Sequence, residues 1–489
     1  MLYLVRIPDS YLTMAGMLFL LVSPIIYFGW SIDAHHSCAF ASVLMGIGLI
    51  SFDPATRFSF DWKFHLPILL LLISFGVLPQ SDNEDILLCS GLLIALCIKP
   101  SLPKIALWLH VAWLVFGVLL TALLIANISA MGYTHESTYR IQPFFAHRNI
   151  ALESFAFLSL AAMKANSRKG FYYLSAALLL SLLFQSRAAM LVSAAGLLLF
   201  YGQAVWNRKN VRFALLGLIS AYAIFQLYLY LLPWDAYKEI FDRLPDVMKS
   251  VEARYNLSNA TSSSERLAIW DWSINNSQLI GHGLGSWKFM AQTHVNEAIG
   301  KYNVIVRRPH SDLIRIIFEL GWLPALALVY LIANRFRHCW KELCVIAPAF
   351  LLSFPMERFE HISMLFLIAF IGEENRKTNM QNSVLRRRII RSATLLLLII
   401  SCLWITSQHI YGKLLRGSRN LKHTTTTERF ILEVFNHDPA LNRLITFQLI
   451  ELHNRGNTKA FQQLLNAVPK NLQNEIWFRN IVVEIENLK

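Results

Sequence analysis

Long apolar runs separated by short polar connectors recur from Ser10 to Tyr411, and they constrain the fold more than any other feature of this sequence. Of the 489 residues, 55% are hydrophobic and only 16% are charged. About a quarter of the residues of a soluble domain usually carry charge. A chain with so little polar surface cannot cover itself in water. The sequence therefore predicts an integral membrane protein whose solvent is the bilayer over most of its length.

Each apolar run is a candidate membrane-spanning helix, because a span needs about 20 apolar residues and fewer where it is partly buried in protein. The segments lie at about 11–30, 37–52, 65–79, 86–98, 104–127, 149–164, 170–185, 188–206, 211–232, 311–333, 343–355, 360–373 and 392–410. The short segments at 343–355 and 360–373 are also compatible with a re-entrant hairpin. We expect an all-α, polytopic transmembrane bundle of about 12–13 spans.

The distribution of Lys and Arg predicts which ends of the segments face the cytoplasm. The formal net charge is +14, and the basic residues collect in every second connector: Arg57 and Lys63, Lys99 and Lys104, Lys164 to Lys169, Arg208 to Arg212, Arg335 to Lys341, and Arg386 to Arg391. Short cytoplasmic loops hold Lys and Arg in this way. A nucleic-acid site would instead gather them on one soluble face, so we expect no nucleic-acid partner.

This topology places three regions outside the cytoplasm: the connector 128–148, the loop 233–310 and the tail 411–489. In the loop, the capping-box sequence Ser262 to Glu265 predicts a helix through Ile274, with aromatic residues suited to the membrane interface. The tail alternates amphipathic stretches with breaks, as in tetratricopeptide-type hairpins. We expect two domains, a membrane domain over 1–410 and a helical region over 411–489.

Three arginines on the predicted outer side are candidates for binding a phosphate-bearing substrate. Arg187 stands in a tight turn between two apolar runs, where a lone cation breaks the rule that the other outer connectors obey. Arg266 lies in the first turn of the predicted loop helix, whose free N–H groups add to an anion site, and Arg148 precedes another span. Arg187 is also compatible with snorkelling to headgroups, and Arg266 with simple solvation. Guanidinium groups pair bidentately with phosphate oxygens, so several on one surface favour an anionic, membrane-tethered substrate.

The end of the outer loop supplies a candidate base and further charges. Arg308 precedes His310, which opens the run at 311–333. A histidine can act as the general base for an acceptor hydroxyl, and it can equally serve to cap or pack a helix start. Asp312 and Glu319 are candidate orienting partners of His310, and both supplement the arginines as supporting residues.

A glycine-rich stretch, Gly281-His282-Gly283-Leu284-Gly285-Ser286, follows no strand of a βαβ unit, so we interpret it as a tight turn that lets the loop pack on the helices. No acidic cluster with metal-ligand spacing occurs in the sequence of the outer loops, and the six cysteines show no zinc-site spacing. The sequence predicts neither a metal nor a cofactor.

These segments together resemble the O-antigen ligase and polymerase superfamily of bacterial envelope glycosyltransferases, which includes protein O-oligosaccharyltransferases. The matching parts are a basic residue between consecutive spans at Arg187, and a large outer loop with Arg266 ahead of the glycine-rich turn. His310 then begins the family pattern of His, a small polar residue, nine residues, Gly, two residues and Gly. Pro324 replaces the final Gly of that pattern. The resemblance covers about residues 140–373.

The resemblance implies an inverting, metal-independent glycosyltransferase of the bacterial inner membrane, with its active site facing the periplasm. The donor would be a glycan on undecaprenyl diphosphate, with Arg187 and Arg266 holding the diphosphate. His310 would activate the acceptor hydroxyl or help to bind the phosphate. Arginines suffice in principle to meet the charge of the leaving diphosphate.

The acceptor is not visible in the sequence, and several interpretations stay open. Ligation to lipid A–core ranks first, ahead of polymerisation of O-antigen or exopolysaccharide and of transfer to a protein. A lipid-glycan transporter is the alternative from another class. Transporters place ionisable or broken-helix sites near the bilayer midplane, whereas here the polar residues gather outside the predicted spans.

Overall fold

The computed structural model of this chain describes residues 11–23, 32–54, 56–58, 83–100, 105–131, 148–184, 186–206, 261–287, 290, 309, 311–335, 337–352, 359–371, 384–415 and 462. Within these residues the chain is helical apart from one two-stranded sheet, which agrees with the predicted all-α class. The predicted spans 65–79 and 211–232, and almost all of the tail 411–489, lie outside the described residues.

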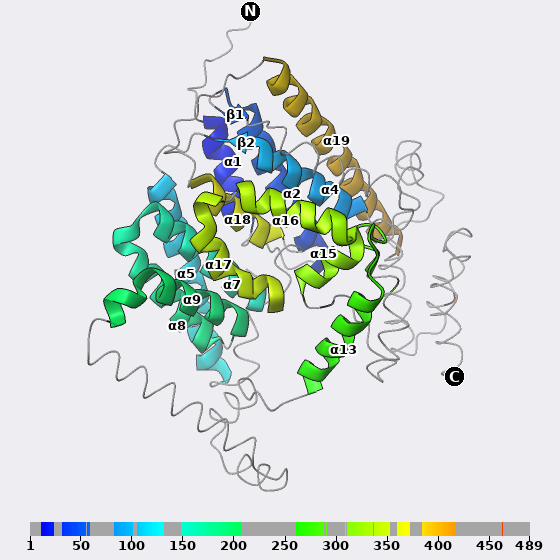
Figure 1. Ribbon diagram of the computed structural model, residues 1–489. Coiled ribbons are helices and arrows are strands. Elements are labelled where there is room, and N and C mark those ends of the chain that lie inside the picture. The colour runs from blue at the N-terminus through cyan, green and yellow to red at the C-terminus, as the bar shows by residue number, and fades with distance from the viewer. Residues whose placement is uncertain are drawn as a thin grey trace, which may run out of the picture.

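Three groups of helices make up the described part of the chain (Figure 1). The first group contains α1 (Tyr11–Val22), α2 (Ile32–Phe52), α4 (Asn83–Cys97) and α19 (Val384–Leu415). The second contains α5 (Ile105–Met131), α7 (Arg148–Ala165), α8 (Gly170–Leu183), α9 (Arg187–Trp206) and α17 (Trp340–Leu352). The third contains α13 (Thr261–Asn275), α15 (Asp312–Leu320) and α16 (Trp322–Arg335). α18 (Phe359–Ile371) packs against α7 of the second group and against α1 and α2 of the first.

The central helix of the bundle is α7, which packs against α5, α8, α9 and α18. Its side chains are buried from Ile150 to Met163, on every face of the helix. An α-helix that is apolar or buried all round belongs to the interior of a large protein or to a membrane span. The neighbouring helices therefore form a shell around α7.

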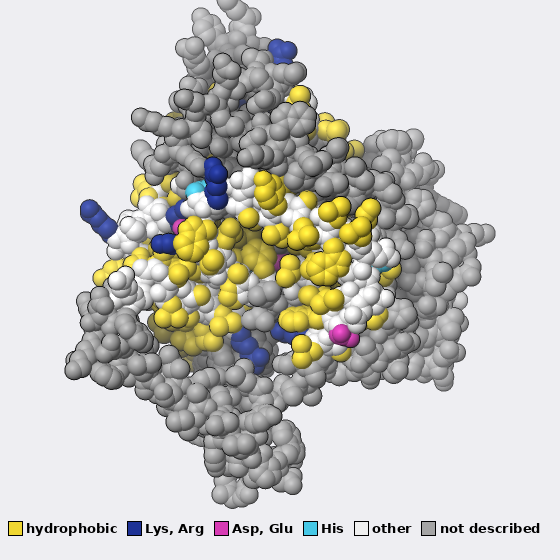
Figure 2. All heavy atoms as spheres, in the orientation of Figure 1, with side chains coloured by type: hydrophobic (Ala, Val, Ile, Leu, Met, Phe, Trp, Pro, Cys, Tyr) yellow, Lys and Arg dark blue, Asp and Glu magenta, His cyan; other side chains and the backbone are white. Residues whose placement is uncertain are grey.

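Helices α5 and α19 present apolar side chains outward. The segments Ile105–Ala130 and Arg388–Thr406 are long and apolar enough to cross a membrane. On α5, Leu107, Val118 and Ile125 are 58%, 64% and 60% exposed. Hydrophobic side chains also cover a broad area of the described surface in Figure 2, and Lys and Arg lie to either side of that area. This distribution fits a surface that contacts lipid, because water would strongly disfavour such exposed apolar area.

Several contacts link segment ends that the charge pattern assigns to the cytoplasmic side. β1 (Arg57–Phe58) pairs antiparallel with β2 (Ile98–Lys99), with Arg57 opposite Lys99. Arg391 at the start of α19 donates hydrogen bonds to the carbonyl oxygens of Ser51, Phe52 and Asp53, at 3.2 Å each. These carbonyls end α2, where helix carbonyls lack partners within the helix. Each contact joins residues that the charge pattern places on one side of the membrane.

The predicted span 311–333 is wrong as a single helix, because the structure divides it into α15 and α16 at Gly321. Gly321 has φ +87° and ψ 165°, a conformation that glycine adopts far more readily than other residues. The predicted loop helix is confirmed in position as α13.

Helices α1 and α2 approach each other closely where Gly16 faces Gly46. A Cβ atom at Gly16 would lie 2.6 Å from the carbonyl oxygen of Gly46, and one at Gly46 would lie 2.8 Å from that of Gly16. Small residues at a helix crossing allow this close backbone packing in membranes.

We predict that Gly16→Ala destabilises the protein by about 1–3 kcal/mol, because the new methyl group meets backbone that cannot move aside cheaply. Gly202→Ala on α9 is the matched control, because nothing lies within 4 Å of its Cβ position. Thermal unfolding of the purified protein in detergent should show a lower midpoint for Gly16→Ala alone. Equal midpoints for the two variants would contradict the close crossing.

Candidate functional site

Four of the residues predicted from the sequence lie at or near the N-terminal ends of helices, whereas Glu319 lies near the C-terminal end of α15. Arg148 is the first residue of α7, Arg187 the first of α9 and Asp312 the first of α15, while Arg266 lies in the second turn of α13. Free N–H groups and the helix dipole make helix N-termini favourable for anions. His310 and Arg308 lie outside the described residues.

The two arginines of the second helix group differ in exposure. Arg148 is fully buried at 0% exposure, whereas Arg187 is partly buried at the turn between α8 and α9. This turn is closed by a hydrogen bond from the Ser186 N–H to the Ser181 carbonyl at 2.8 Å, and the Ser186 carbonyl accepts from Met190 at 3.0 Å. Arg187 therefore starts α9 directly after a hydrogen-bonded turn, with its side chain partly buried.

Helix α13 is anchored on residues that flank position 310. The indole Nε1 of Trp270 donates to the carbonyl oxygen of Pro309 at 2.6 Å. Ile269 forms a buried apolar cluster with Trp287 and Phe318, and Trp287 Nε1 donates to Ser273 Oγ at 2.8 Å. The helix that carries Arg266 is thus fixed to α15, just beyond His310 in the sequence.

Helix α15 carries a buried charged face. Asp312, Arg315 and Glu319 are spaced so that they share one side of the helix, and they are 1%, 6% and 1% exposed. The Nε of Arg315 donates to Glu319 Oε2 at 3.0 Å. The sequence predicted Glu319 as an orienting partner of His310, and the structure gives this carboxylate Arg315 as a partner. Ser311 caps the helix by accepting from the Ile314 N–H at 3.5 Å.

The glycine-rich stretch is a turn that docks on the C-terminal end of α15, which confirms the interpretation from the sequence. Backbone N–H groups of Gly281 and Gly283 donate to the carbonyls of Leu320 and Glu319, at 2.8 Å each. The N–H of Trp322 donates in return to Gln278 at 3.1 Å. A Cβ atom at Gly281 would lie 2.3 Å from the backbone of Glu319, so the two backbones meet directly. The N–H of His282 also donates to the carbonyl of Phe318 at 3.3 Å, so three consecutive N–H groups of the turn bind carbonyls at the end of α15.

The first turns of α7 are held by α18 through a buried polar contact. His361 Nε2 donates to the carbonyl oxygen of Ile150 at 3.1 Å, and His361 Nδ1 lies 3.7 Å from Glu153 Oε2. The ring of Phe157 meets the His361 ring edge-on at 5.4 Å between centroids. Ile150, Glu153 and Phe157 share one face of α7, so α18 fixes the rotation and depth of the helix that begins at Arg148.

The structure brings the predicted residues together in two sets. α7 and α9, with Arg148 and Arg187, pack against each other, and so do α13 and α15, with Arg266, Asp312 and Glu319. Helix α17 packs against both α9 and α15 and so links the two sets. Guanidinium groups and helix N-termini are both groups that favour an anion. In the described part of the chain, no group of three or more His, Cys, Asp or Glu residues is placed to hold a metal ion.

Three buried ionisable residues near these positions were missed by the sequence reasoning. Arg315 precedes Glu319 by four residues and follows Asp312 by three, a spacing that could have revealed the charged face of α15. Glu153 and His361 stand inside predicted spans, and an ionisable residue within a span is a functional candidate by that fact alone.

Comparison with known proteins supports one family. The sequence profile described as O-antigen ligase matches residues 154–330, which run from within α7 to within α16. The match includes Arg187, Arg266, His310, Asp312 and Glu319, and it begins after Arg148. A search of curated proteins found no match.

We predict that Gly281→Ala loosens the loop from α15, because a methyl group at this position cannot fit against the α15 backbone. Limited proteolysis of the purified protein should cut within residues 276–287 several times faster in this variant than in the wild type. Gly202→Ala serves as the control with the same chemical change in open space. Unchanged cleavage of Gly281→Ala would show that the turn does not depend on this close approach.

Proposed function

Because the chain belongs to the O-antigen ligase superfamily, we propose that it transfers a glycan from undecaprenyl diphosphate to an acceptor on the periplasmic face of the bacterial inner membrane. The first-ranked acceptor is lipid A–core, which would place the reaction in lipopolysaccharide biosynthesis. One observation carries the proposal. The family match spans the helices that bear Arg187 and Arg266 and the charged start of α15.

The proposed diphosphate site uses the arginines at the helix starts. Arg187 is partly exposed at the N-terminus of α9, so its guanidinium can meet a lipid-linked phosphate without leaving its turn. Arg266 is partly buried on α13, the helix tied to Pro309 by Trp270. Bidentate pairing orients phosphate oxygens as well as neutralising them. Arg148, buried at the start of α7, would add positive potential behind the first contacts.

The proposed chemistry is a single displacement at the anomeric carbon of the donor sugar. The acceptor hydroxyl oxygen forms the new glycosidic bond while the bond to the diphosphate oxygen breaks, which inverts the anomeric configuration. His310 would take the proton from the acceptor hydroxyl. Undecaprenyl diphosphate leaves with the electron pair, and the arginines stabilise its growing charge. In this scheme guanidinium groups perform the electrostatic work that a metal ion performs in other phosphate chemistry.

The charged face of α15 would support His310 from the following turns. Asp312 and Glu319 lie on the same side of the helix and are buried. Arg315 binds Glu319 at 3.0 Å, so the carboxylate keeps its charge balanced in a water-poor surrounding. The short α15 ends at Gly321, where the glycine-rich turn holds it. The helix that follows the proposed base in the sequence is thus held at both its N-terminal and C-terminal ends.

A transfer assay with the purified protein tests this function directly. The donor is an undecaprenyl-diphosphate glycan, no metal is added, EDTA is present, and lipid A–core competes with a second lipid-linked glycan. Product on lipid A–core supports ligation, and chain growth on the second glycan would make the enzyme a polymerase. A protein carrying the glycan in a parallel reaction would make it a protein transferase. Absence of any product with wild-type protein would contradict the proposed function.

We predict that Arg187→Ala lowers kcat/KM for the lipid-linked donor by at least about 100-fold, as for the loss of one strong transition-state contact. Arg187→Lys should recover part of this loss, because it restores the charge without the bidentate geometry. Arg388→Ala is the matched control, since Arg388 is an exposed arginine on α19 away from the described site. Similar rates for all three variants, at equal protein levels, would remove Arg187 from the site.

A further inference from the structure

A second set of cations lies at the opposite ends of α7 and α9, far along these helices from Arg148 and Arg187. Three elements carry it: η1 (Ser167–Lys169) after α7, η2 (Arg337–Cys339), and the first turn of α17. The exposed members are Arg168, Lys169, Arg337 and Lys341. We call these four residues the basic rim. The transferase site described above uses none of them.

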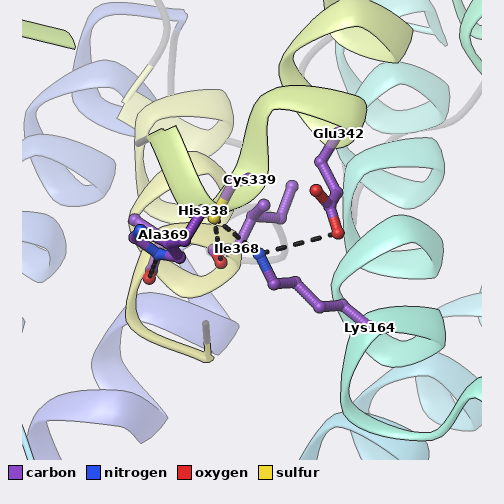
Figure 3. A network of polar contacts seen from close by, with 6 residues as sticks. All are labelled: Lys164, His338, Cys339, Glu342, Ile368 and Ala369. Carbon is purple, nitrogen blue, oxygen red and sulfur yellow. Dashed lines mark hydrogen bonds and ion pairs between the residues drawn. The ribbon is translucent and has the colours of Figure 1, made fainter. Parts of the chain in front are cut away.

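A network of polar contacts joins the end of α7 to η2, α17 and α18 beside the basic rim (Figure 3). Lys164, near the end of α7, lies 3.6 Å from Glu342 Oε1 of α17 through its Nζ atom, and it also donates to the thiol of Cys339. The thiol contacts the carbonyl oxygen of Ile368 at 3.6 Å, and His338 Nε2 donates to the carbonyl of Ala369 at 3.0 Å. The network thus fixes η2 against both α7 and α18. The ends of three helices are held in place before any ligand arrives.

The carboxylate of Glu342 in α17 does not balance the charge of the basic rim. Glu342 is the one acidic residue in the sequence from 160 to 172 and from 335 to 345. Its side chain is only 10% exposed, and it faces Lys164. Within these two stretches of the sequence, the four exposed cations therefore carry a net positive charge. A region of this charge attracts anions more strongly than a mixed surface does.

Exposed aromatic and aliphatic side chains border the same cations. Phe171 and Tyr172 at the start of α8 are 43% and 70% exposed, and Trp340 at the start of α17 is 56% exposed. The Lys341 Nζ lies 5.8 Å from the centre of the Trp340 ring. Further along these elements, Leu179 of α8 and Leu326 of α16 are 57% and 64% exposed. In Figure 2, Lys and Arg side chains lie beside a broad hydrophobic area of the described surface.

We infer that the basic rim binds the headgroup of an anionic phospholipid, whose acyl chains lie along the adjoining apolar helix faces. The phosphate would meet the cations, the aromatic rings would lie at headgroup depth, and the tails would cover the leucines. Aromatic residues concentrate at this depth in membrane proteins, and basic pockets between helix ends bind anionic lipid headgroups. A soluble phosphate or an acidic peptide would leave the apolar part of this surface uncovered. A phospholipid would contact both the cations, through its headgroup, and the apolar side chains, through its acyl chains. The inference is independent of the proposed transferase activity.

Lipid binding to the purified full-length protein tests this inference. Native mass spectrometry in detergent compares phosphatidylglycerol with phosphatidylcholine carrying identical acyl chains, so that only the headgroup charge differs. We expect the wild type to bind phosphatidylglycerol more tightly than phosphatidylcholine. The double variant Arg337→Gln/Lys341→Gln should bind phosphatidylglycerol about 25-fold more weakly than the wild type, because each lost cation weakens binding roughly fivefold. The double variant Arg168→Gln/Lys169→Gln should show a loss of the same order. Phosphatidylcholine binding should not change.

Arg388→Gln is the matched control, because it removes one exposed arginine outside the basic rim. It should leave the affinity for phosphatidylglycerol within about twofold of the wild type, below the effect of one rim cation. Unchanged thermal unfolding of all variants shows that the surface changes leave the fold intact. Equal affinities of the wild type for the two lipids, or an equal loss in Arg388→Gln, would overturn the inference.

Discussion

The buried position of α7 is the constraint on which the rest of the described structure depends. A helix surrounded on every face must satisfy its polar groups from its neighbours, because neither water nor lipid headgroups can reach them. Glu153 faces His361 of α18, Trp113 of α5 donates to Ser159 Oγ, and Lys164 meets Glu342 of α17. The shell of helices therefore has a fixed register around α7. That register determines where the arginine at the start of the helix and the cationic turn at its other end are placed.

The candidate site depends on a second structural feature, the backbone contact between two glycines. Gly281 and Gly321 bring the backbone of the outer loop against the end of α15. This contact divides what would have been one long span into a short helix with buried charges and a longer apolar one. The short helix can then carry Asp312, Arg315 and Glu319 in a buried face that a lipid-facing helix could not tolerate. The loop helix with Arg266 is held to the same element through Phe318 and Pro309.

Much of this organisation could be predicted from local patterns. The apolar runs gave the helices with ends within a few residues in most cases, as for α7, α8 and α9. The capping box anticipated α13, and the glycines anticipated the turn. The apolar pattern did not predict the break at Gly321, because the apolar run continues through this residue. The positive φ of Gly321 accompanies the docking of Gly281, which lies 40 residues earlier in the sequence. The pair of His361 with Glu153 depends on which faces of α18 and α7 pack together, and local sequence does not show this. The placement of His310 lies outside the described residues.

In the proposed orientation, the arginine-bearing helix ends and the basic rim lie on opposite sides of one membrane. Cysteine labelling measures this most directly, in a background where the six native cysteines are replaced by alanine. Gln278→Cys in the outer loop and Lys169→Cys in η1 are both exposed positions. In right-side-out spheroplasts, a membrane-impermeant maleimide should label Gln278→Cys at once, and Lys169→Cys only after permeabilisation. Labelling of Lys169→Cys in intact spheroplasts, with Gln278→Cys protected, would contradict the orientation and the periplasmic site together.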